Sequence, residues 1–334
     1  MAYFGPETTG DAVVSCFPEQ VKGKTFLING CVPGGLGSQI AVSLAKAGPA
    51  RLWLLAHAGD ADQLQTVMTE IGDLDASIQV TMTLMDPAKL GSVSAAAQEI
   101  LGDAKSTPHI DALFNIQTGM PRPDYCKTED GQEYLWQVNF LSQFLLTTQI
   151  LDKVLSAGGR VINTSSSANK ISGVRFHDVQ FEEPDSYDQW TAYGQSKTAA
   201  ILFTAALNAR HASAAFGGPH GFRSYAVHPG GVKTKLQEQL SEETLSKAFE
   251  ATRRRFGEET AKDFFRWKTL AAASSTPLRA ALDRSLASRA GMWLEDGDLH
   301  EHSIHLDPRA TDIEDAGRLW KLAETLIAER LKGI

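Results

Sequence analysis

The chain lacks any run of about 18 consecutive apolar residues, the length that a membrane-spanning helix needs. Its first residues include Glu7 and Asp11, and they lack the basic-then-apolar pattern of a secretory signal peptide. Cysteine is scarce: Cys16, Cys31 and Cys126 are odd in number and scattered, which indicates a reducing compartment rather than a disulfide framework. These absences predict a cytoplasmic protein without a membrane anchor.

The chain also lacks a Pro/Ser-rich linker, an internal repeat and a low-complexity segment, although 334 residues could hold two domains. We therefore expect one domain over residues 1–334, with a large core. The formal net charge of −8 argues against binding to nucleic acid or to an anionic membrane. The basic run Arg253-Arg-Arg255 is an exception that we interpret as a solvated helix face, with a phosphate contact as the alternative.

A metal site is not expected either. His300, His302 and His305 lie in a polar stretch near the C-terminus, without a Cys or carboxylate set of recognisable ligand spacing. We therefore expect surface histidines there.

A glycine-rich turn, Asn29-Gly30-Cys-Val-Pro-Gly34-Gly35-Leu36-Gly37, follows an apolar run that begins near Thr25. The strict G-x-G-x-x-G fingerprint is missing, since Ile40 stands where its last glycine would be, and no Walker-type Gly-Lys-Ser/Thr follows. Residues 38–47 have a helical apolar pattern. Strand, glycine turn and helix in this order direct backbone N–H groups at a phosphate, although a lone turn of this kind is more often only a turn.

The turn heads a series of alternating strand and helix patterns. Strands are predicted at 51–56, 77–85, 111–116, 159–165 and 222–228, and helices at 61–71, 88–101, 130–155 and 189–207. This alternation predicts an α/β fold with a doubly wound, parallel sheet of Rossmann type. Ligands bind beyond the carboxyl ends of such strands, where Gly30, the pair Ser165 and Ser166, and His228 fall.

Tyr193 and Lys197 are the most informative residues of the chain. In the run Thr191-Ala-Tyr-Gly-Gln-Ser-Lys197 they are four apart, so on a helix they share a face about one turn apart. A nearby ammonium stabilises phenolate and lowers the tyrosine pKa from about 10, which makes the phenol a usable proton donor and acceptor. The same spacing is common on solvated helix faces, so by itself it does not indicate catalysis. The alternating strand and helix series around the pair favours the catalytic interpretation.

With these residues, the chain resembles the short-chain dehydrogenase/reductase family, and most of all its retinol-dehydrogenase-like and fungal tailoring reductases. The resemblance runs from about Val21 to Leu331. It is carried by the combination of the glycine turn, Asp86, Asn139 in Val-Asn-Phe-Leu-Ser-Gln-Phe, the strand Arg160-Val-Ile-Asn-Thr-Ser-Ser166, Tyr193 to Lys197, His228-Pro229-Gly230, Gly291–Asp296 and Arg318–Leu322.

The resemblance implies roles for single residues. Ser166, with Ser165 as the alternative, would polarise the substrate carbonyl, and Tyr193 would transfer the proton. Lys197 would bind the nicotinamide ribose and lower the tyrosine pKa, while Asn139 would hold a water that links Lys197 to solvent. The implied cofactor-binding residues are Gly30, Gly35, Leu36, Gly37, Asp86 at the adenine, Asn115, Tyr193, Lys197, and Thr234 at the nicotinamide carboxamide.

Each assignment has a structural alternative: turn formation for the serines, a backbone-satisfied helix residue for Asn139, and a cap before Pro87 for Asp86. The chain also departs from the family pattern. Its glycine turn is one residue longer than usual, and only Asn115 remains of the usual Asn-Asn-Ala-Gly strand end. Ala58-Gly59-Asp60 stand where many NADP-preferring relatives carry an arginine. Family habit implies NADP, with NAD not excluded, in which case Asp60 would bind the ribose.

Two insertions, residues 167–190 and 236–276, are expected to form the substrate site. Phe256, Phe264, Phe265 and Trp267 in the second have the spacing of core residues, yet the family has its lid here. An aromatic lid indicates a lipophilic or polycyclic small molecule.

The expected function is therefore NAD(P)-dependent hydride transfer to or from a carbonyl or secondary alcohol, with secondary metabolism as the setting suggested by the fungal resemblance. The alternatives are isomerase or cyclase chemistry at the same site, and a non-catalytic nucleotide-binding scaffold. Assembly into a homo-oligomer is left open.

Overall fold

A computed structural model describes residues 4–103, 108–183, 185–212, 221–232, 234 and 241–332. Its centre is an eight-stranded sheet with the order β10-β9-β6-β5-β4-β1-β2-β3. All neighbouring strands from β3 to β9 are parallel, and β10 pairs antiparallel with β9. The strand order reverses between β1 and β4, which is where a doubly wound sheet opens a crevice for ligands. The predicted fold class is confirmed.

The sheet contains β1 (Thr25–Asn29), β2 (Arg51–Ala56), β3 (Gln79–Leu84), β4 (Ala112–Asn115), β5 (Arg160–Thr164), β6 (Arg223–His228), β9 (Trp293–Glu295) and β10 (Asp298–His300). Strands β1, β2, β4 and β5 are buried along their whole length, as expected for a parallel sheet that is covered on both faces. A separate two-stranded ribbon pairs β7 (Gly231–Val232) with β8 (Trp267–Lys268).

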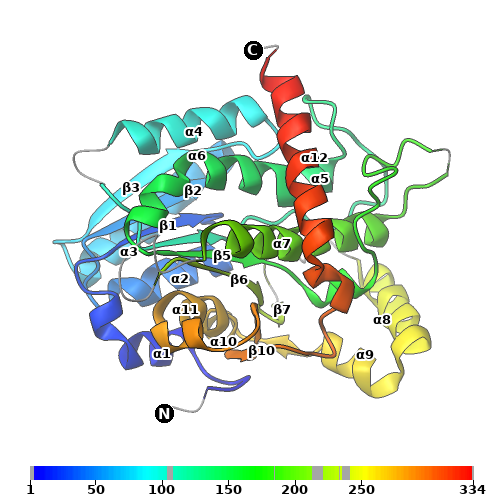
Figure 1. Cartoon of the computed structure of the whole chain (residues 1–334). Coiled ribbons are helices and arrows are strands. Elements are labelled where there is room, and N and C mark those ends of the chain that lie inside the picture. The colour runs from blue at the N-terminus through cyan, green and yellow to red at the C-terminus, as the bar shows by residue number, and fades with distance from the viewer. Residues whose placement is uncertain are drawn as a thin grey trace.

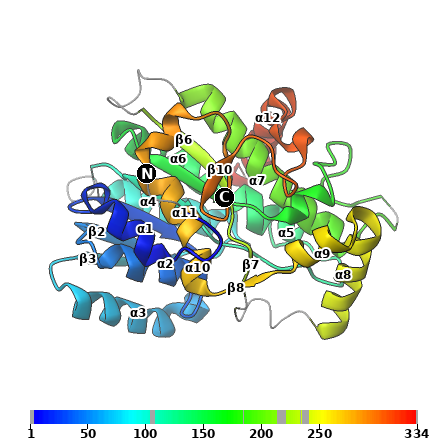
Figure 2. The same ribbon diagram turned by 90° about the horizontal axis from the view of Figure 1, so that it is seen from below.

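Helices cover the two faces of the sheet (Figure 1). One layer contains α4 (Leu90–Gly102), α6 (Ser142–Ser156), α7 (Gln189–His211) and α12 (Ile313–Leu331). The other contains α1 (Gly10–Cys16), α2 (Leu36–Ala45), α3 (Ala61–Leu74), α10 (Leu270–Ala273) and α11 (Ser275–Leu282), with α1 beside α11 (Figure 2). Alternate strand residues serve the two layers: Leu27 packs in the first, whereas Phe26 and Ile28 pack in the second.

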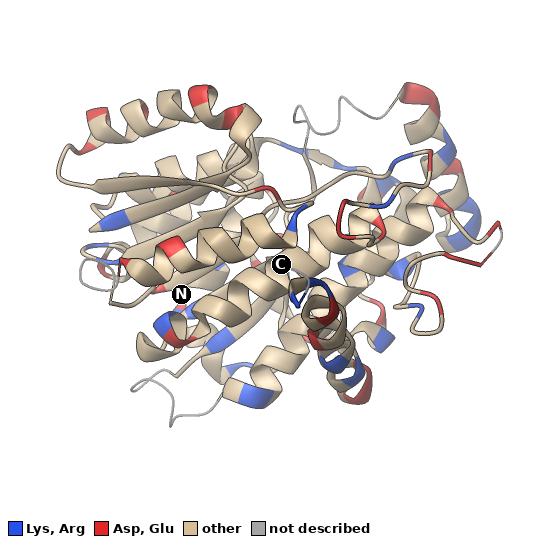
Figure 3. Ribbon diagram, turned by 90° about the horizontal axis from the view of Figure 1, so that it is seen from above, with Lys and Arg blue, Asp and Glu red and all other residues tan. Residues whose placement is uncertain are grey.

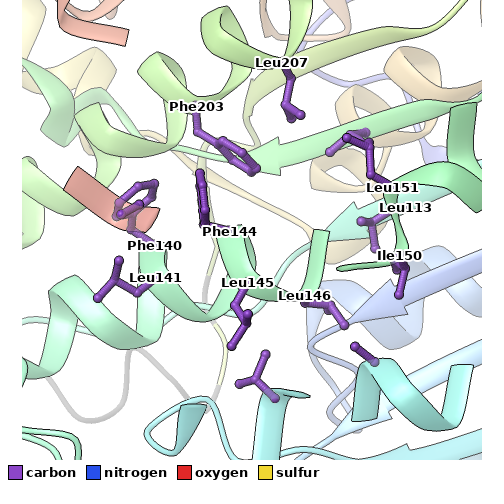
Figure 4. Packing of buried hydrophobic residues seen from close by; sticks show 14 of the residues in the cluster. Leu113, Phe140, Leu141, Phe144, Leu145, Leu146, Ile150, Leu151, Phe203 and Leu207 are labelled. Atoms are coloured by element: carbon purple, nitrogen blue, oxygen red, sulfur yellow. The ribbon is translucent and has the colours of Figure 1, made fainter. Parts of the chain in front are cut away.

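The first layer combines aliphatic side chains with a group of aromatic rings from α6, α7 and the segment before α6. Phe144 contacts Phe140 at 5.9 Å and Phe203 at 5.1 Å between ring centroids (Figure 4). Trp320 of α12 joins the group at 4.9 Å from Phe144. This packing fixes α7 on the sheet, and α7 carries Tyr193 and Lys197. None of the helices in the described ranges is long and apolar enough to cross a membrane.

The prediction of one helix over 130–155 is wrong in two respects: the helical segment starts later, and it is not a continuous α-helix. The helical segment begins at α5 (Tyr134–Trp136), since the carboxylate of Glu133 accepts hydrogen bonds from the N–H groups of Leu135 and Trp136 and so caps the end. A π-helical turn, Gln137–Leu141, then leads into α6. That turn contains Asn139, and such turns are frequent at functional sites.

The two predicted insertions lie beside the sheet rather than in it. The first includes the 3-10 turn η4 (Ser167–Lys170) and continues to the start of α7, and Glu182, Glu183 and Ser186 in it bond to the Asp178 carboxylate. The second includes α8 (Glu242–Phe256) and α9 (Glu258–Phe264), at the right of Figure 1, and then β8. Its last residues, 270–276, belong instead to α10 and the start of α11 in the second helix layer. Residues 236–240 of the predicted range lie outside the described residues.

Candidate active site

A cavity of about 1030 Å³ opens at the carboxyl ends of the central strands. Its walls come from the glycine turn, the ends of β2, β3, β4 and β5, the start of α7, the segment after β6, and α8 and α9. The predicted site residues that line it are Gly30, Gly35, Leu36, Asp86, Ser165, Ser166, Tyr193, Lys197, His228 and Thr234. The structure thus brings together residues that are spread over 200 positions of the chain.

The glycine turn works by close approach of backbones. Gly30 has φ +102°, and a Cβ on it would lie 2.4 Å from the nitrogen of Gln117. A Cβ on Gly37 would lie 2.3 Å from the Gly30 oxygen, so glycine at both positions allows α2 to begin directly over β1. The extended Gly35 precedes α2, and the Ser38 hydroxyl donates to the Val32 oxygen. Gly37 itself is not a wall of the cavity; it acts through this packing.

The ends of β2 and β3 contribute His57, Asp60 and Asp86 to the cavity. Oδ1 of Asp86 accepts from the N–H of Ala88 at 2.9 Å, as the capping alternative requires. Its Oδ2 faces His57 Nε2 at 3.9 Å. One carboxylate oxygen of Asp86 therefore stabilises the turn, and the other lies at the end of the cavity where an adenosine would bind.

Tyr193 and Lys197 lie on one face of α7 and are both buried, with 8% and 1% exposed. The Lys197 ammonium is 5.4 Å from the centroid of the Tyr193 ring. It donates to Thr118 Oγ1 at 3.0 Å and to the Thr164 carbonyl oxygen at 3.3 Å. Thr118 was not predicted as a site residue, because it lies in the strand end that departs from the family pattern.

Burial governs the charge state of the pair. It raises the pKa of Tyr193 to about 12, against which a hydrogen bond with Ser166 acts in the lowering direction. Burial also lowers the pKa of Lys197 to about 7. Lys197 is not among the groups that lower the Tyr193 pKa in this structure, where desolvation disfavours the charged form of each residue; the expectation that Lys197 lowers it stays a prediction.

The two serines at the end of β5 point in different directions, as successive strand residues do. Ser166 lies close enough to Tyr193 to lower the pKa of its phenol, and its hydroxyl accepts from the N–H of Ala168 at 3.2 Å. The Ser165 hydroxyl donates to the carbonyl oxygen of Lys197 at 2.8 Å and is 2% exposed. Ser166 is thus beside the phenol, whereas Ser165 ties the strand end to α7.

Asn139 is held by the loop after β4. Its Oδ1 accepts from the N–H of Gly119 at 2.6 Å, and its Nδ2 donates to the Gly119 oxygen and to Ser196 Oγ. These bonds fix Gly119, whose neighbour Thr118 accepts from Lys197. The side chain is satisfied by the protein, as the structural alternative proposed, and the predicted water bridge stays a prediction.

Asn115 does not belong to the cavity. Its side chain is fully buried, and its Nδ2 donates to Asn163 Oδ1 at 2.9 Å and to Thr147 Oγ1 at 3.0 Å. Asn29 reaches its Oδ1 at 3.4 Å, so the amides cross-link β1, β4 and β5 within the core. The predicted cofactor contact of Asn115 is replaced by this structural role, because its side chain points into the sheet interior.

His305 is not the surface histidine that the sequence predicts. It is 7% exposed, with Nδ1 2.8 Å from Glu295 Oε2 on β9 and Nε2 3.0 Å from Asp263 Oδ2 on α9. The isolated tail sequence hides this contact, since Asp263 lies 42 positions upstream. Within the described ranges, no group of three or more His, Cys, Asp or Glu is arranged to hold a metal ion.

Comparison with known proteins is consistent with this geometry. A family model for short chain dehydrogenase matches residues 24–178. Human retinol dehydrogenase 11 is 30% identical over 92% of this chain and 87% of its own length. The chain belongs to the short-chain dehydrogenase/reductase family. The oxidoreductase fscI of Fusarium equiseti is 34% identical over 68% of this chain and 95% of its own length.

Solved structures agree on the fold. A short chain dehydrogenase from Burkholderia cenocepacia in complex with NADP superposes with a TM-score of 0.58 at 21% identity, covering 83% of this chain and 98% of the other. Membership of the family, shown by the family model and the curated relatives, makes the protein an NAD(P)-dependent dehydrogenase/reductase.

The described residues fit such a cofactor. The glycine turn lines the cavity at the start of α2, where Gly34 faces open space, so a phosphate could approach the backbone N–H groups there. At the other end, Thr164 Oγ1 and His228 Nδ1 are buried without a hydrogen-bond partner in the described structure, although both residues line the cavity. Buried polar atoms normally form hydrogen bonds, so these two atoms fit a polar group of a bound ligand.

The low Lys197 pKa predicts a stability effect. Below about pH 7 the folded protein must bury a charged ammonium, which lowers the free energy of unfolding. Between pH 7 and the unfolded pKa of 10.5 only the unfolded state stays protonated, so this destabilisation falls as the pH rises. Lys197→Met should therefore increase the free energy of unfolding by a few kcal/mol at about pH 6, with the difference shrinking as pH rises. Urea unfolding without added cofactor measures this, and Lys321→Met, at an exposed lysine of α12, is the control. A destabilised Lys197→Met protein at pH 6 would contradict it.

The serine geometry predicts a ranking of two variants. Ser166→Ala removes a donor beside the reacting oxygen and should lower kcat about 10²–10³-fold, with little change in cofactor Kd. Ser165→Ala removes a bond to the α7 backbone and should mainly lower the melting temperature. Steady-state kinetics and thermal unfolding of both variants give the ranking; the reverse order would show that the strand register at the site is shifted by one residue.

Proposed function

We propose that this protein reduces a ketone of a lipophilic small molecule, with Tyr193, Ser166 and Lys197 as the catalytic centre. The observation that carries the proposal is that Tyr193, Ser166 and Lys197 line one cavity at the end of β5, with Ser166 beside the phenol, while aromatic lid residues line the same cavity. A nucleotide-binding scaffold would not need a phenol and a hydroxyl in contact there.

The bound nicotinamide supplies or accepts the hydride. The chain supplies the proton chemistry: Ser166 donates a hydrogen bond to the substrate oxygen, and Tyr193 transfers a proton to or from it. Lys197, with its neighbours Thr118 and Thr164, orients the cofactor ribose and gives the phenol a path for its proton. Asn139 positions this group through Gly119.

The charge state favours the reductive direction. Reduction begins with a protonated phenol, the form that burial stabilises when it raises the Tyr193 pKa to about 12. Oxidation would begin with phenolate, which the same burial disfavours. The proton leaves the phenol as the alkoxide forms, so the neutral acid is the resting form that the reaction needs.

The lid supports a lipophilic substrate. Phe256, Phe264, Phe265 and Trp267 all line the cavity, together with Trp190 of the first insertion. Trp190 lies edge-on to Tyr193 with ring centroids 6.4 Å apart, so an apolar skeleton against it would reach the phenol. Both insertions therefore contribute to the proposed substrate site, and a polycyclic skeleton, as in secondary metabolism, suits these walls.

Removing one oxygen atom tests the mechanism. Tyr193→Phe should lower kcat by about 10²–10⁴-fold while cofactor Kd changes little, because only the ionisable group is lost. The assay follows the absorbance of reduced nicotinamide with a panel of polycyclic and long-chain ketones. Tyr125→Phe, an exposed tyrosine outside the cavity, is the matched control. Full activity of Tyr193→Phe would refute the assignment, and no turnover of any ketone by the wild type would favour isomerase chemistry or a scaffold.

For the cofactor we propose NADH rather than the NADPH expected from the sequence. The residues that line the adenosine end belong to the turns after β1, β2 and β3, and none of those described is Lys or Arg. Asp60 and Asp86 give this end a negative charge, which would repel a dianionic 2′-phosphate. His57 is the one side chain there that could offset it, and it already faces Asp86.

Calorimetric titration should show NADH binding about tenfold or more tighter than NADPH, a difference of about 1.4 kcal/mol. Asp60→Asn should narrow this ratio by improving NADPH binding, whereas Asp62→Asn, at an exposed position outside the cavity, should not. Tighter binding of NADPH by the wild type would overturn the proposal.

A further inference from the structure

Two arginines line the substrate end of the cavity. Arg122, in the loop between β4 and α5, has its guanidinium carbon 3.6 Å from the centroid of the Tyr134 ring. Its backbone is anchored as well, since the Tyr187 hydroxyl donates to the Arg122 carbonyl oxygen at 2.8 Å. The first insertion thus holds the main chain of this residue, while an aromatic face supports its charge.

Arg255 comes from the opposite side, on the last turn of α8. It lies over the Phe256 ring at 5.0 Å and donates to the carbonyl oxygen of Ile171 at 3.3 Å. It belongs to the basic run of the sequence, but its neighbours differ: Arg253 pairs with Glu250 outside the cavity, and Arg254 does not line the cavity. Acidic and basic residues alternate along the lid helices (Figure 3), and of that run only Arg255 lines the cavity.

Both arginines border the wall that carries the catalytic tyrosine. Tyr134 and Ile171, their respective supports, pack in one apolar cluster with Tyr193. A substrate that reaches Tyr193 along this wall would therefore lie near both arginines.

Neither guanidinium has an acidic partner. Within the described part of the chain, no carboxylate lies within 4.0 Å of Arg122 or Arg255, although most lid cations are paired. Two acids of this region have other partners. Asp188 accepts from the N–H and hydroxyl of Thr191 as the cap of α7. Glu133, whose pKa burial raises and the Arg122 charge lowers, accepts from the N–H groups of Leu135 and Trp136. In a chain of net charge −8, two arginines at one cavity without a carboxylate within 4.0 Å form a positive site.

We propose that the substrate carries an oxyanion, a carboxylate or sulfate, on its apolar skeleton, and that Arg122 and Arg255 bind it. This inference rests on the proposed function and adds the chemical class of the substrate. The planar guanidinium matches a carboxylate or sulfate in a bidentate way, while the aromatic lid takes the skeleton. The anion fixes one end of the molecule, and the ketone at the other end meets Tyr193.

The test compares acids with their neutral counterparts. Binding of dehydrocholate, a polycyclic keto acid, and of its methyl ester is measured by calorimetry on protein saturated with oxidised cofactor, so that no ketone is consumed. Estrone 3-sulfate and estrone form the second pair. Wild-type protein should bind the anionic member of at least one pair about tenfold or more tightly than the neutral one; the pair that shows the preference identifies carboxylate or sulfate.

The preference should depend on the two named side chains. Arg122→Gln and Arg255→Gln should each reduce it several-fold, Arg255→Lys should retain part of it, and Arg254→Gln, in the same run but outside the cavity, should leave it unchanged. Thermal unfolding checks that each variant is folded. Equal affinity of both members in both pairs, including failure of all four to bind, overturns the proposal, as does a preference that survives both glutamine variants.

Turnover with reduced cofactor separates this inference from the proposed function. If the anion preference depends on the arginines but no ketone is reduced, the anion site stands and the ketone chemistry fails. If the neutral ketones and the corresponding acids are reduced with equal kcat/KM, the ketone chemistry stands and the anion site fails.

Discussion

The site depends on the side-chain amine of Lys197, which extends from α7 into the interior and is almost fully shielded from solvent. Within the described part of the chain Lys197 finds two acceptors, Thr118 Oγ1 after β4 and the Thr164 oxygen at the end of β5. Because an unsatisfied buried ammonium is so costly, the loop after β4, the end of β5 and α7 must keep a fixed mutual position. Asn139 and Ser165 reinforce that position through Gly119 and through the α7 backbone.

The two halves of the cavity are built by different means. The half proposed for the nucleotide is formed mainly by backbone. Glycine at positions 30 and 37 lets α2 start against β1, where any side chain would collide with the main chain. At the catalytic half polar side chains converge from strand ends and α7. A parallel sheet brings these ends to one edge, so residues as distant as Gly30 and Thr234 border one space.

The sequence predicted the strand series well, because buried parallel strands read as short apolar runs between helical patterns. It also predicted α7, although not its last turn. The start of α5 and the π-turn were missed, since a carboxylate cap at Glu133 and a local change of winding leave no periodic signal. Asn115 and His305 were misjudged for a related reason: their partners, Asn163 and Asp263, are distant in sequence, and only tertiary packing decides whether a polar side chain faces a cavity or the core.

The lid helix α8 has no buried residue, yet its face with Leu245, Ala248 and Thr252 is turned toward the cavity. The adjoining α9 is pinned to the body, because Asp263 contacts His305, which in turn contacts Glu295 of β9. The lid is therefore held to the body at α9, and α8 is held to it through the ring contacts Phe249–Phe265 and Phe256–Phe264. An apolar substrate against the cavity face of α8 would bury that face at about 25 cal/mol for each Å². On the proposed function, the substrate's own apolar surface would then exclude water from the site of hydride transfer.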